Sequence, residues 1–160
     1  VLGNTTLATA SASVTFSSIP GGYKDLVLVV QAGSTSAGGD AIMMQFNGDT
    51  SYSNYFNVFM EGDGSTATSG AWTTNGIANS YNTVHFSSAA NGALVWQVMD
   101  FTTTDKHKST LVRSNRASSG VSGAAGRWAN TAAITSITLV YGNPAASFSA
   151  GSTFRLLGVN

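Results

Sequence analysis

The chain has 160 residues, with seven Lys plus Arg, seven Asp plus Glu and no Cys. This length predicts a single domain over residues 1–160, and a neutral chain with only 9% charged residues has no basic stripe for nucleic acid and no polybasic face for a membrane. The lack of Cys excludes disulfides and thiolate chemistry, and such sparse charge favours association with other copies.

Short runs of β-branched and aromatic residues recur along the whole chain, and no window shows sustained helical spacing of apolar residues. Gly, Asn and Ser separate these runs, as turns require. About eight to ten such strands predict an all-β fold, an antiparallel β-sandwich of jelly-roll type. In chain order, the expected strands are residues 13–19, 25–32, 41–48, 55–61, 82–88, 93–101, 108–115, 133–142 and 152–159, with residues 123–130 as a further candidate.

Two expected strands are apolar on both faces, "LVLVV" at residues 26–30 and "ALVWQVM" at residues 93–99. Such strands are central in a sheet, or their outer face is covered by a loop or a neighbouring subunit. The stretch from residue 61 to residue 82 has the weakest pattern and is expected as a long loop, together with Gly/Ser/Ala-rich connections at residues 31–40 and 115–126. Loops of that length usually carry function or cover another part of the protein.

Polar and aromatic residues are concentrated in "FNGDTSYSNY", residues 46–55, directly after an expected strand. The stretch has one carboxylate, Asp49, and lacks both the acidic spacing of a calcium loop and the glycine and lysine spacing of a phosphate-binding loop. Asn and Gly readily adopt positive φ, and Asp bonds nearby backbone groups. We therefore interpret the stretch as a strand-ending turn, with ligand contact through Tyr52 and Tyr55 as the alternative.

Signatures of catalysis are missing from the sequence. Its two histidines, His85 and His107, lie in an expected strand and between two lysines, no nucleophile elbow occurs, and the seven acids form no recognisable pair. We predict that the protein is not an enzyme and has no catalytic residue, no cofactor and no structural transition metal. Calcium held by Asp49 or Asp63 together with backbone carbonyls stays open.

The three tryptophans receive different interpretations. Trp96 lies inside an apolar run and is expected in the core, and Trp128 is expected as a packed anchor. Trp72 lies in the stretch from 61 to 82 with Tyr81 near it in the sequence, and exposed aromatic side chains stack on sugar rings or anchor protein interfaces. Its alternative role is to pin that stretch to its own sheet. The candidate binding residues are Trp72, Tyr52, Tyr55 and Tyr81.

Arginines are spread along the chain, and Arg113 and Arg116 in "RSNR" predict a local basic spot. A solvated turn, or a pair with an acid of another subunit, fits this spot better than a phosphate site, because no cluster of further cations surrounds it.

Four segments, taken in order, span most of the chain: "TTLATASASVTFSSIPGGYKDLVLVVQA", "QFNGDTSYSNY", "WANTAAITSITL" and "AGSTFRLLGV". Together they resemble the short β-rich virion structural proteins of tailed bacteriophages, including phages of cyanobacteria. Residues 61–93 match that group least. The resemblance implies a jelly-roll sandwich on a phage particle and no catalytic residue.

The function implied by this resemblance is that of a non-enzymatic virion protein at the particle surface, either a capsid decoration (cement) protein or a small tail-fibre subunit. Its partners would be sister copies, in a homotrimer, and other virion proteins such as the capsid shell or the tail. Self-association follows from the composition, and threefold order follows from the resemblance. The alternatives are a glycan-binding receptor-recognition module for a host surface glycan, and a hydrolase.

Overall fold

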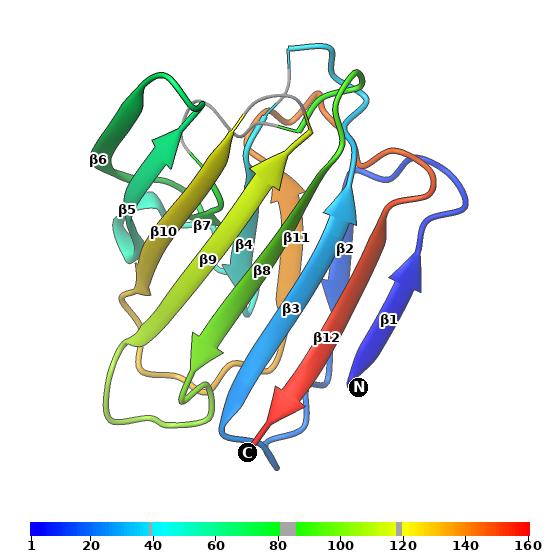
Figure 1. Ribbon diagram of the computed structural model, residues 1–160. Helices are drawn as coiled ribbons and strands as arrows, with labels where there is room; N and C mark the ends of the chain where they lie inside the picture. Colours follow the sequence, from blue (N-terminus) through cyan, green and yellow to red (C-terminus); the bar gives the residue numbers. More distant parts are fainter. Residues whose placement is uncertain (39, 81–85, 118–119) are drawn as a thin grey trace.

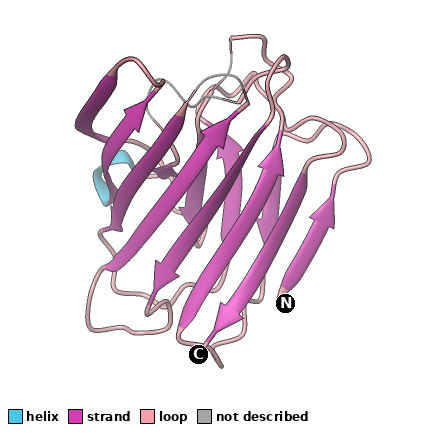
Figure 2. Ribbon diagram, viewed as in Figure 1, coloured by secondary structure: helices cyan, strands magenta, loops and turns pink. Residues whose placement is uncertain are grey.

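The computed structural model describes residues 1–38, 40–80, 86–117 and 120–160, which form two antiparallel β-sheets packed face to face. Figure 1 shows the larger sheet in front and the smaller sheet behind it. Besides strands and loops, the described residues contain one short helical turn, η1 (Tyr52–Asn54) (Figure 2). The predicted antiparallel β-sandwich is confirmed, whereas a jelly-roll connectivity is not specifically confirmed. No helix in the described ranges is long and apolar enough to cross a membrane.

The large sheet has eight strands in the order β1-β12-β3-β8-β9-β10-β5-β6, and the small sheet has four in the order β2-β11-β4-β7. The strands of the large sheet are β1 (Gly3–Thr6), β3 (Asp25–Ala32), β5 (Tyr55–Gly62), β6 (Ala67–Thr73), β8 (Gly92–Met99), β9 (Lys108–Arg116), β10 (Val121–Trp128) and β12 (Thr153–Val159). Those of the small sheet are β2 (Ser13–Phe16), β4 (Ile42–Phe46), β7 (Ile77–Ala78) and β11 (Ile137–Tyr141).

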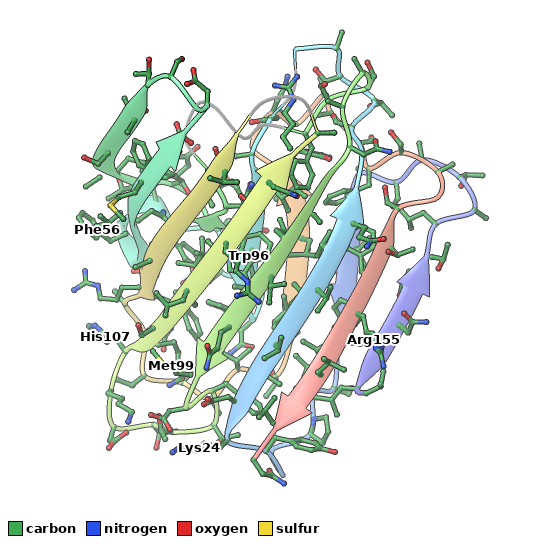
Figure 3. All side chains as sticks on the ribbon, in the orientation of Figure 1. Lys24, Phe56, Trp96, Met99, His107 and Arg155 are labelled. Atoms are coloured by element: carbon green, nitrogen blue, oxygen red, sulfur yellow. The ribbon has the colours of Figure 1, made fainter. Side chains whose placement is uncertain are left out.

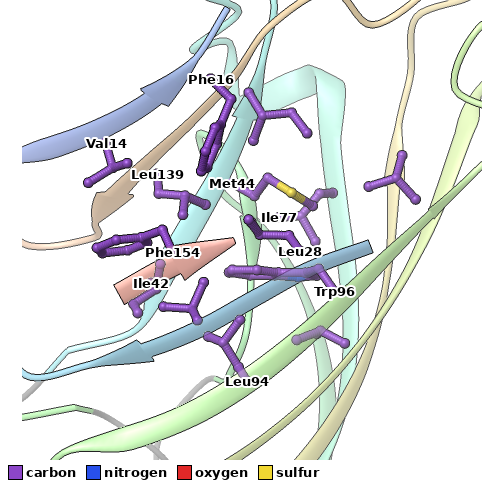
Figure 4. Packing of buried hydrophobic residues seen from close by; sticks show 14 of the residues in the cluster. Val14, Phe16, Leu28, Ile42, Met44, Ile77, Leu94, Trp96, Leu139 and Phe154 are labelled. Carbon is purple, nitrogen blue, oxygen red and sulfur yellow. The ribbon is translucent and has the colours of Figure 1, made fainter. Parts of the chain in front are cut away.

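The core lies between the sheets, because alternate side chains of each long strand point toward the other sheet. Leu28 of β3 and Trp96 of β8 are fully buried, as are Met44 and Leu139 of the small sheet. Figure 4 shows these four side chains within one continuous cluster. The expectation that Trp96 is a core residue is confirmed.

The runs that are apolar on both faces form β3 and β8, which are neighbours in the middle of the large sheet. Their central position is therefore confirmed. Their inward residues complete the core, while Val27, Val29 and Val95 on the other face are only half-buried. Nothing within the described residues covers that second face of the sheet as a second layer.

The expectation of one long loop from 61 to 82 is wrong for the part that the structure describes, since β6 and β7 lie within it. A tight turn closes the β5–β6 hairpin. Asp63 Oδ1 accepts hydrogen bonds from the backbone N–H of Ser65 (2.8 Å) and of Thr66 (2.7 Å), and Gly64 has a φ of +94°. This local turn brings a weakly patterned segment into register with β5.

Two other expectations need correction or fall outside the structure. Residues 121–128 form β10 between β9 and β5, which confirms the further candidate strand at residues 123–130 and corrects the connection that is expected to continue to residue 126. Residues 82–85 of the expected strand at 82–88 lie outside the described residues, and of the three that remain, Phe86 and Ser87 form isolated bridges with Asp40 and Ala90.

Candidate interaction surface

The outer face of the large sheet, which is the face turned away from the small sheet, carries a row of apolar side chains that runs across seven strands. The register of the strands places one residue of each strand beside one residue of the next, and every residue in the row is apolar except Gln97. From β12 to β6 the row is Leu157, Val27, Gln97, Leu111, Ala125, Val58 and Ala71. The parallel row beside it is Arg155, Val29, Val95, Arg113, Gly123, Met60 and Ser69.

Large apolar side chains on this face are exposed over the adjacent strands β9, β10 and β5. Met60 is 69% exposed, Val121 65%, Leu111 50%, Val58 45% and Phe56 41%. A shallow groove of about 720 Å³ runs across the face between β3 and β5. Contiguous exposed apolar surface of this kind marks interaction sites in soluble proteins.

Three exposed arginines, Arg113, Arg127 and Arg155, accompany these apolar side chains on the outer face. Figure 3 shows Phe56 toward one side of the face and Arg155 toward the other. Among the described residues, none of the three forms a salt bridge; the ion pair found there joins Lys106 to Asp100 at 2.8 Å. The outer face therefore combines apolar area with unpaired positive charge.

The predicted local basic spot of Arg113 and Arg116 is wrong, because residues three apart in a strand point to opposite faces. Arg113 lies on the outer face, whereas the guanidinium of Arg116 donates a 3.3 Å hydrogen bond to the buried hydroxyl of Ser87.

Three of the four predicted binding residues, Tyr52, Tyr55 and Trp72, lie in the described part of the chain, and they differ in exposure. Tyr55 is fully buried: its hydroxyl accepts a bond from the backbone N–H of Phe46 and donates one to the carbonyl of Asp49, both at 2.9 Å. Burial raises the pKa of Tyr55. The structure therefore does not support Tyr55 as a contact residue, since a side chain without exposed surface cannot stack on a ligand. Tyr52 in η1 is 63% exposed.

Trp72 lies in β6 and packs against the inner side of the sheet. Its ring is 4.9 Å from that of Phe59 in an edge-to-face arrangement. Gly70 makes room for this pair, because a Cβ at that position would lie 2.8 Å from the Phe59 ring. This geometry favours the interpretation that Trp72 pins its segment to the sheet. Tyr81 lies outside the described residues.

The stretch from Phe46 to Tyr55 is a strand-ending turn, as interpreted, with positive φ at Asn47 (52°) and Gly48 (72°). Both oxygens of the Asp49 carboxylate accept hydrogen bonds. Oδ1 accepts one from the Ser51 N–H (2.9 Å), and Oδ2 accepts two, from Asn54 Nδ2 (2.8 Å) and from Trp128 Nε1 (2.7 Å). The expectation that Trp128 is a packed anchor is confirmed. Both carboxylate oxygens of Asp49 are engaged, which disfavours calcium at this turn.

A second group of polar side chains is buried on the inner face of β5, β9 and β10. Ser80 Oγ donates to Glu61 Oε2 at 2.7 Å, the hydroxyls of Ser114 and Ser122 lie 2.7 Å apart, and Ser122 Oγ donates to the carbonyl of Asn79 at 2.8 Å. Such bonds satisfy buried polar atoms. Within the described ranges, no group of three His, Asp or Glu is placed to hold a metal ion.

Comparisons with known proteins leave function open. No protein-family model matches the chain. No curated protein matches it either. Solved structures that are similar include scytalido-glutamic peptidase with a transition state analog inhibitor (11% identity, TM-score 0.38, covering 96% of this chain and 82% of that one). Another is the legume lectin-like domain from Entamoeba histolytica (8% identity, TM-score 0.33, 96% and 82%). At these values the similarity supports no inference about activity or ligand.

Sequence reasoning missed the exposed apolar residues of the outer face. Phe56, Val58 and Met60 alternate along β5, a pattern that marks one face of a strand. The other face of the same strand also holds aromatic residues, Tyr55 and Phe59, so alternation alone does not tell which face is covered.

Proposed function

We propose that the protein is a non-enzymatic virion structural protein of a tailed bacteriophage, displayed on the particle surface as a capsid decoration (cement) protein or a small tail-fibre subunit. The observation that carries its mode of action is the outer face, where Met60 and Val58 of β5 and Leu111 of β9 are exposed, with β10 between the two strands. Burying such apolar area against another protein is favourable. The place on a virion rests on the resemblance of the sequence segments.

The charge of the outer face selects its partner. Two copies packed face to face would set arginines against arginines, and like charges across an interface oppose association. Within the described residues, no acid forms a salt bridge with Arg113, Arg127 or Arg155. We therefore assign the outer face to a different virion protein, such as the shell or the tail, whose contact surface carries carboxylates.

Sister copies are the second class of partner in this proposal, and they require another surface. The homotrimer stays a prediction that rests on the resemblance. The glycan-binding alternative gains no support from the arrangement of its aromatic residues, because Tyr55 is in the core and Trp72 packs on Phe59.

Incorporation into particles tests the proposal. A phage whose own copy of the gene is deleted is grown on cells that supply wild type, Leu111→Glu, Val58→Glu or Thr50→Glu. Thr50 serves as the control. It is exposed in the turn after β4, a strand of the small sheet, and does not belong to the outer face of the large sheet. The chain is then quantified in purified particles by mass spectrometry.

We expect wild type and Thr50→Glu to be incorporated, and the two outer-face variants to fall at least about tenfold, since a buried glutamate that faces the carboxylates of the partner opposes the contact. Circular dichroism and melting temperature should remain unchanged in all four. Absence of the wild-type chain from washed particles would overturn the virion role. Equal incorporation of all variants would overturn the outer face as the contact surface.

A further inference from the structure

Strand β6 forms one edge of the large sheet and is the longest of the edge strands. It has seven residues, against four in β1, four in β2 and two in β7. Natural edge strands are protected from pairing by charged residues, proline, bulges or shortness. The sequence "ATSGAWT" has no charge and no proline, and its register with β5 is continuous. Figure 1 shows β6 at the outer border of the sheet.

The backbone of β6 has groups directed away from the sheet. The hairpin bond from Asp63 N–H to the Thr66 carbonyl (3.2 Å) fixes which residue pairs bond across β5 and β6. Because hydrogen-bonded pairs alternate in an antiparallel ladder, Thr68, Gly70 and Trp72 bond to β5. The N–H and C=O groups of the intervening residues face outward, and no backbone hydrogen bond found within the described part of the chain reaches those of Ser69 or Ala71.

The surroundings of this edge suit a second copy of the same strand. The outer-face side chains of β6 are small, at Ala67, Ser69 and Ala71. One carboxylate, Asp63, stands at the hairpin end of β6, and the opposite end finishes at the uncharged Thr73. In an antiparallel pair of identical strands, the hairpin end of one copy lies beside the Thr73 end of the other, so the two carboxylates stay apart.

We propose that β6 pairs antiparallel with β6 of a second copy, so that two eight-stranded sheets join into one continuous sheet about a twofold axis. The pairing satisfies the outward backbone groups of both strands at once. It also brings Phe56, Val58 and Met60 of the two copies onto one surface, because the axis of an antiparallel strand pair is perpendicular to the sheet and leaves both outer faces on the same side.

This inference rests on the self-association in the proposed function and replaces its threefold order by twofold order. It also gives the outer face a further property. A dimer would present two identical contact surfaces to the underlying virion protein, and linked contacts bind more tightly than single ones when both are reached together.

Substitutions at Ala71 test the strand pairing. Ala71→Pro removes an outward N–H that β5 does not use, a change that edge strands tolerate, and Ala71→Val keeps that N–H as the matched control. The mass of each purified 160-residue protein is measured by light scattering at micromolar and tenfold higher concentrations. We expect twice the 16.4 kDa monomer mass for wild type and Ala71→Val, and 16.4 kDa for Ala71→Pro.

Cysteine cross-linking gives an independent readout, because the chain has no native Cys. Single-cysteine variants at Ala67, Ser69 and Ala71 are oxidised, with Asn4→Cys on the opposite edge strand β1 as the control. We expect a covalent dimer from at least one β6 position, the one nearest the twofold axis, and none from Asn4→Cys. If Ala71→Pro fails to fold, this measurement decides.

The outcomes separate the two proposals. A wild-type monomer at both concentrations overturns the strand pairing and the self-association alike, whereas incorporation into particles is measured independently of both. A trimer mass that Ala71→Pro does not change overturns the β6 contact and leaves self-association standing. Equal cross-linking from β6 and from Asn4→Cys also overturns the contact.

Discussion

The indole Nε1–H of Trp128 donates a 2.7 Å hydrogen bond to the carboxylate of Asp49, and this bond joins the last residue of β10 to the turn that follows β4. Trp128 belongs to the large sheet, whereas the turn that holds Asp49 follows a strand of the small sheet. The hydrogen bond thereby fixes the beginning of the turn to the large sheet. Hydrogen bonds within the protein therefore account for the polar residues between Phe46 and Tyr55 without a ligand.

Replacing Asp49 should destabilise the fold. Asp49→Ala removes the acceptor of three hydrogen bonds, and bonds to a charged group contribute about 1.5–3 kcal/mol. We expect the free energy of unfolding to fall by about 2 kcal/mol in urea titrations with an unchanged slope. Asp105→Ala, at an exposed loop position, is the control and should change it by less than about 0.5 kcal/mol. Equal effects would contradict the anchoring role.

Acid should weaken the fold through the same carboxylate. Burial pushes the pKa of Asp49 upward, but hydrogen bonds from Trp128, Ser51 and Asn54 outweigh it and hold the pKa below the ordinary value of an aspartate. At the β5–β6 turn, the N–H groups of Thr66 and Ser65 lower the pKa of Asp63 to about 2. A depressed pKa in the folded state gives stability that is present above the unfolded value and is lost as pH falls through the folded value.

We therefore expect the melting temperature to fall between about pH 4 and pH 2. The fall should be shallower in Asp49→Asn, which cannot titrate, than in wild type. Thermal melts followed by circular dichroism across this range are the measurement. Parallel curves for the two proteins would show that Asp49 is not a source of the acid sensitivity.

The hydroxyl of Tyr55 should stabilise the protein without any part in binding. Tyr55→Phe leaves the buried N–H of Phe46 without its acceptor, and an unsatisfied buried donor costs about 1–3 kcal/mol. Urea titration should report that loss, while Tyr52→Phe, at an exposed tyrosine, should be neutral. A neutral Tyr55→Phe would mean that water replaces the hydroxyl.

Trp72 should also act on stability. Trp72→Ala removes an edge-to-face pair with Phe59 and half-buried apolar area, and we expect a loss of about 1–2 kcal/mol. Trp72→Phe keeps an aromatic ring and should recover about half of it. Unchanged stability of Trp72→Ala, together with weaker association, would instead assign Trp72 to a contact surface.

The sequence predicts the sandwich well because strand periodicity is local. β3 and β8 are recognisable from apolar residues on both faces, and Trp96 follows from them. β5 shows the limit. Its inner face holds Asn57 and Glu61 beside Tyr55 and Phe59, while its outer face holds Phe56, Val58 and Met60. A rule that places polar residues outside would reverse this strand.

What decides the orientation of β5 is long-range chemistry. Asn57 Oδ1 accepts from the Ala78 N–H (3.1 Å), and Glu61 accepts from Ser80. These partners lie about twenty residues away, in a segment without a strong pattern of its own. The candidate surface could not be predicted for the same reason, since its apolar residues are recognisable as exposed only after the polar ones have found partners inside.

Strand β12 lies between β1 and β3, although it is the last strand of the chain. During synthesis, β3 therefore keeps an unpaired edge next to the core until the final strand has left the ribosome. Sheets closed by such distant pairings fold slowly and expose aggregation-prone edges while they wait. We expect variants that shorten or weaken β12 to lower the yield of soluble protein far more than equally destabilising changes in β6, which pairs with its hairpin neighbour β5.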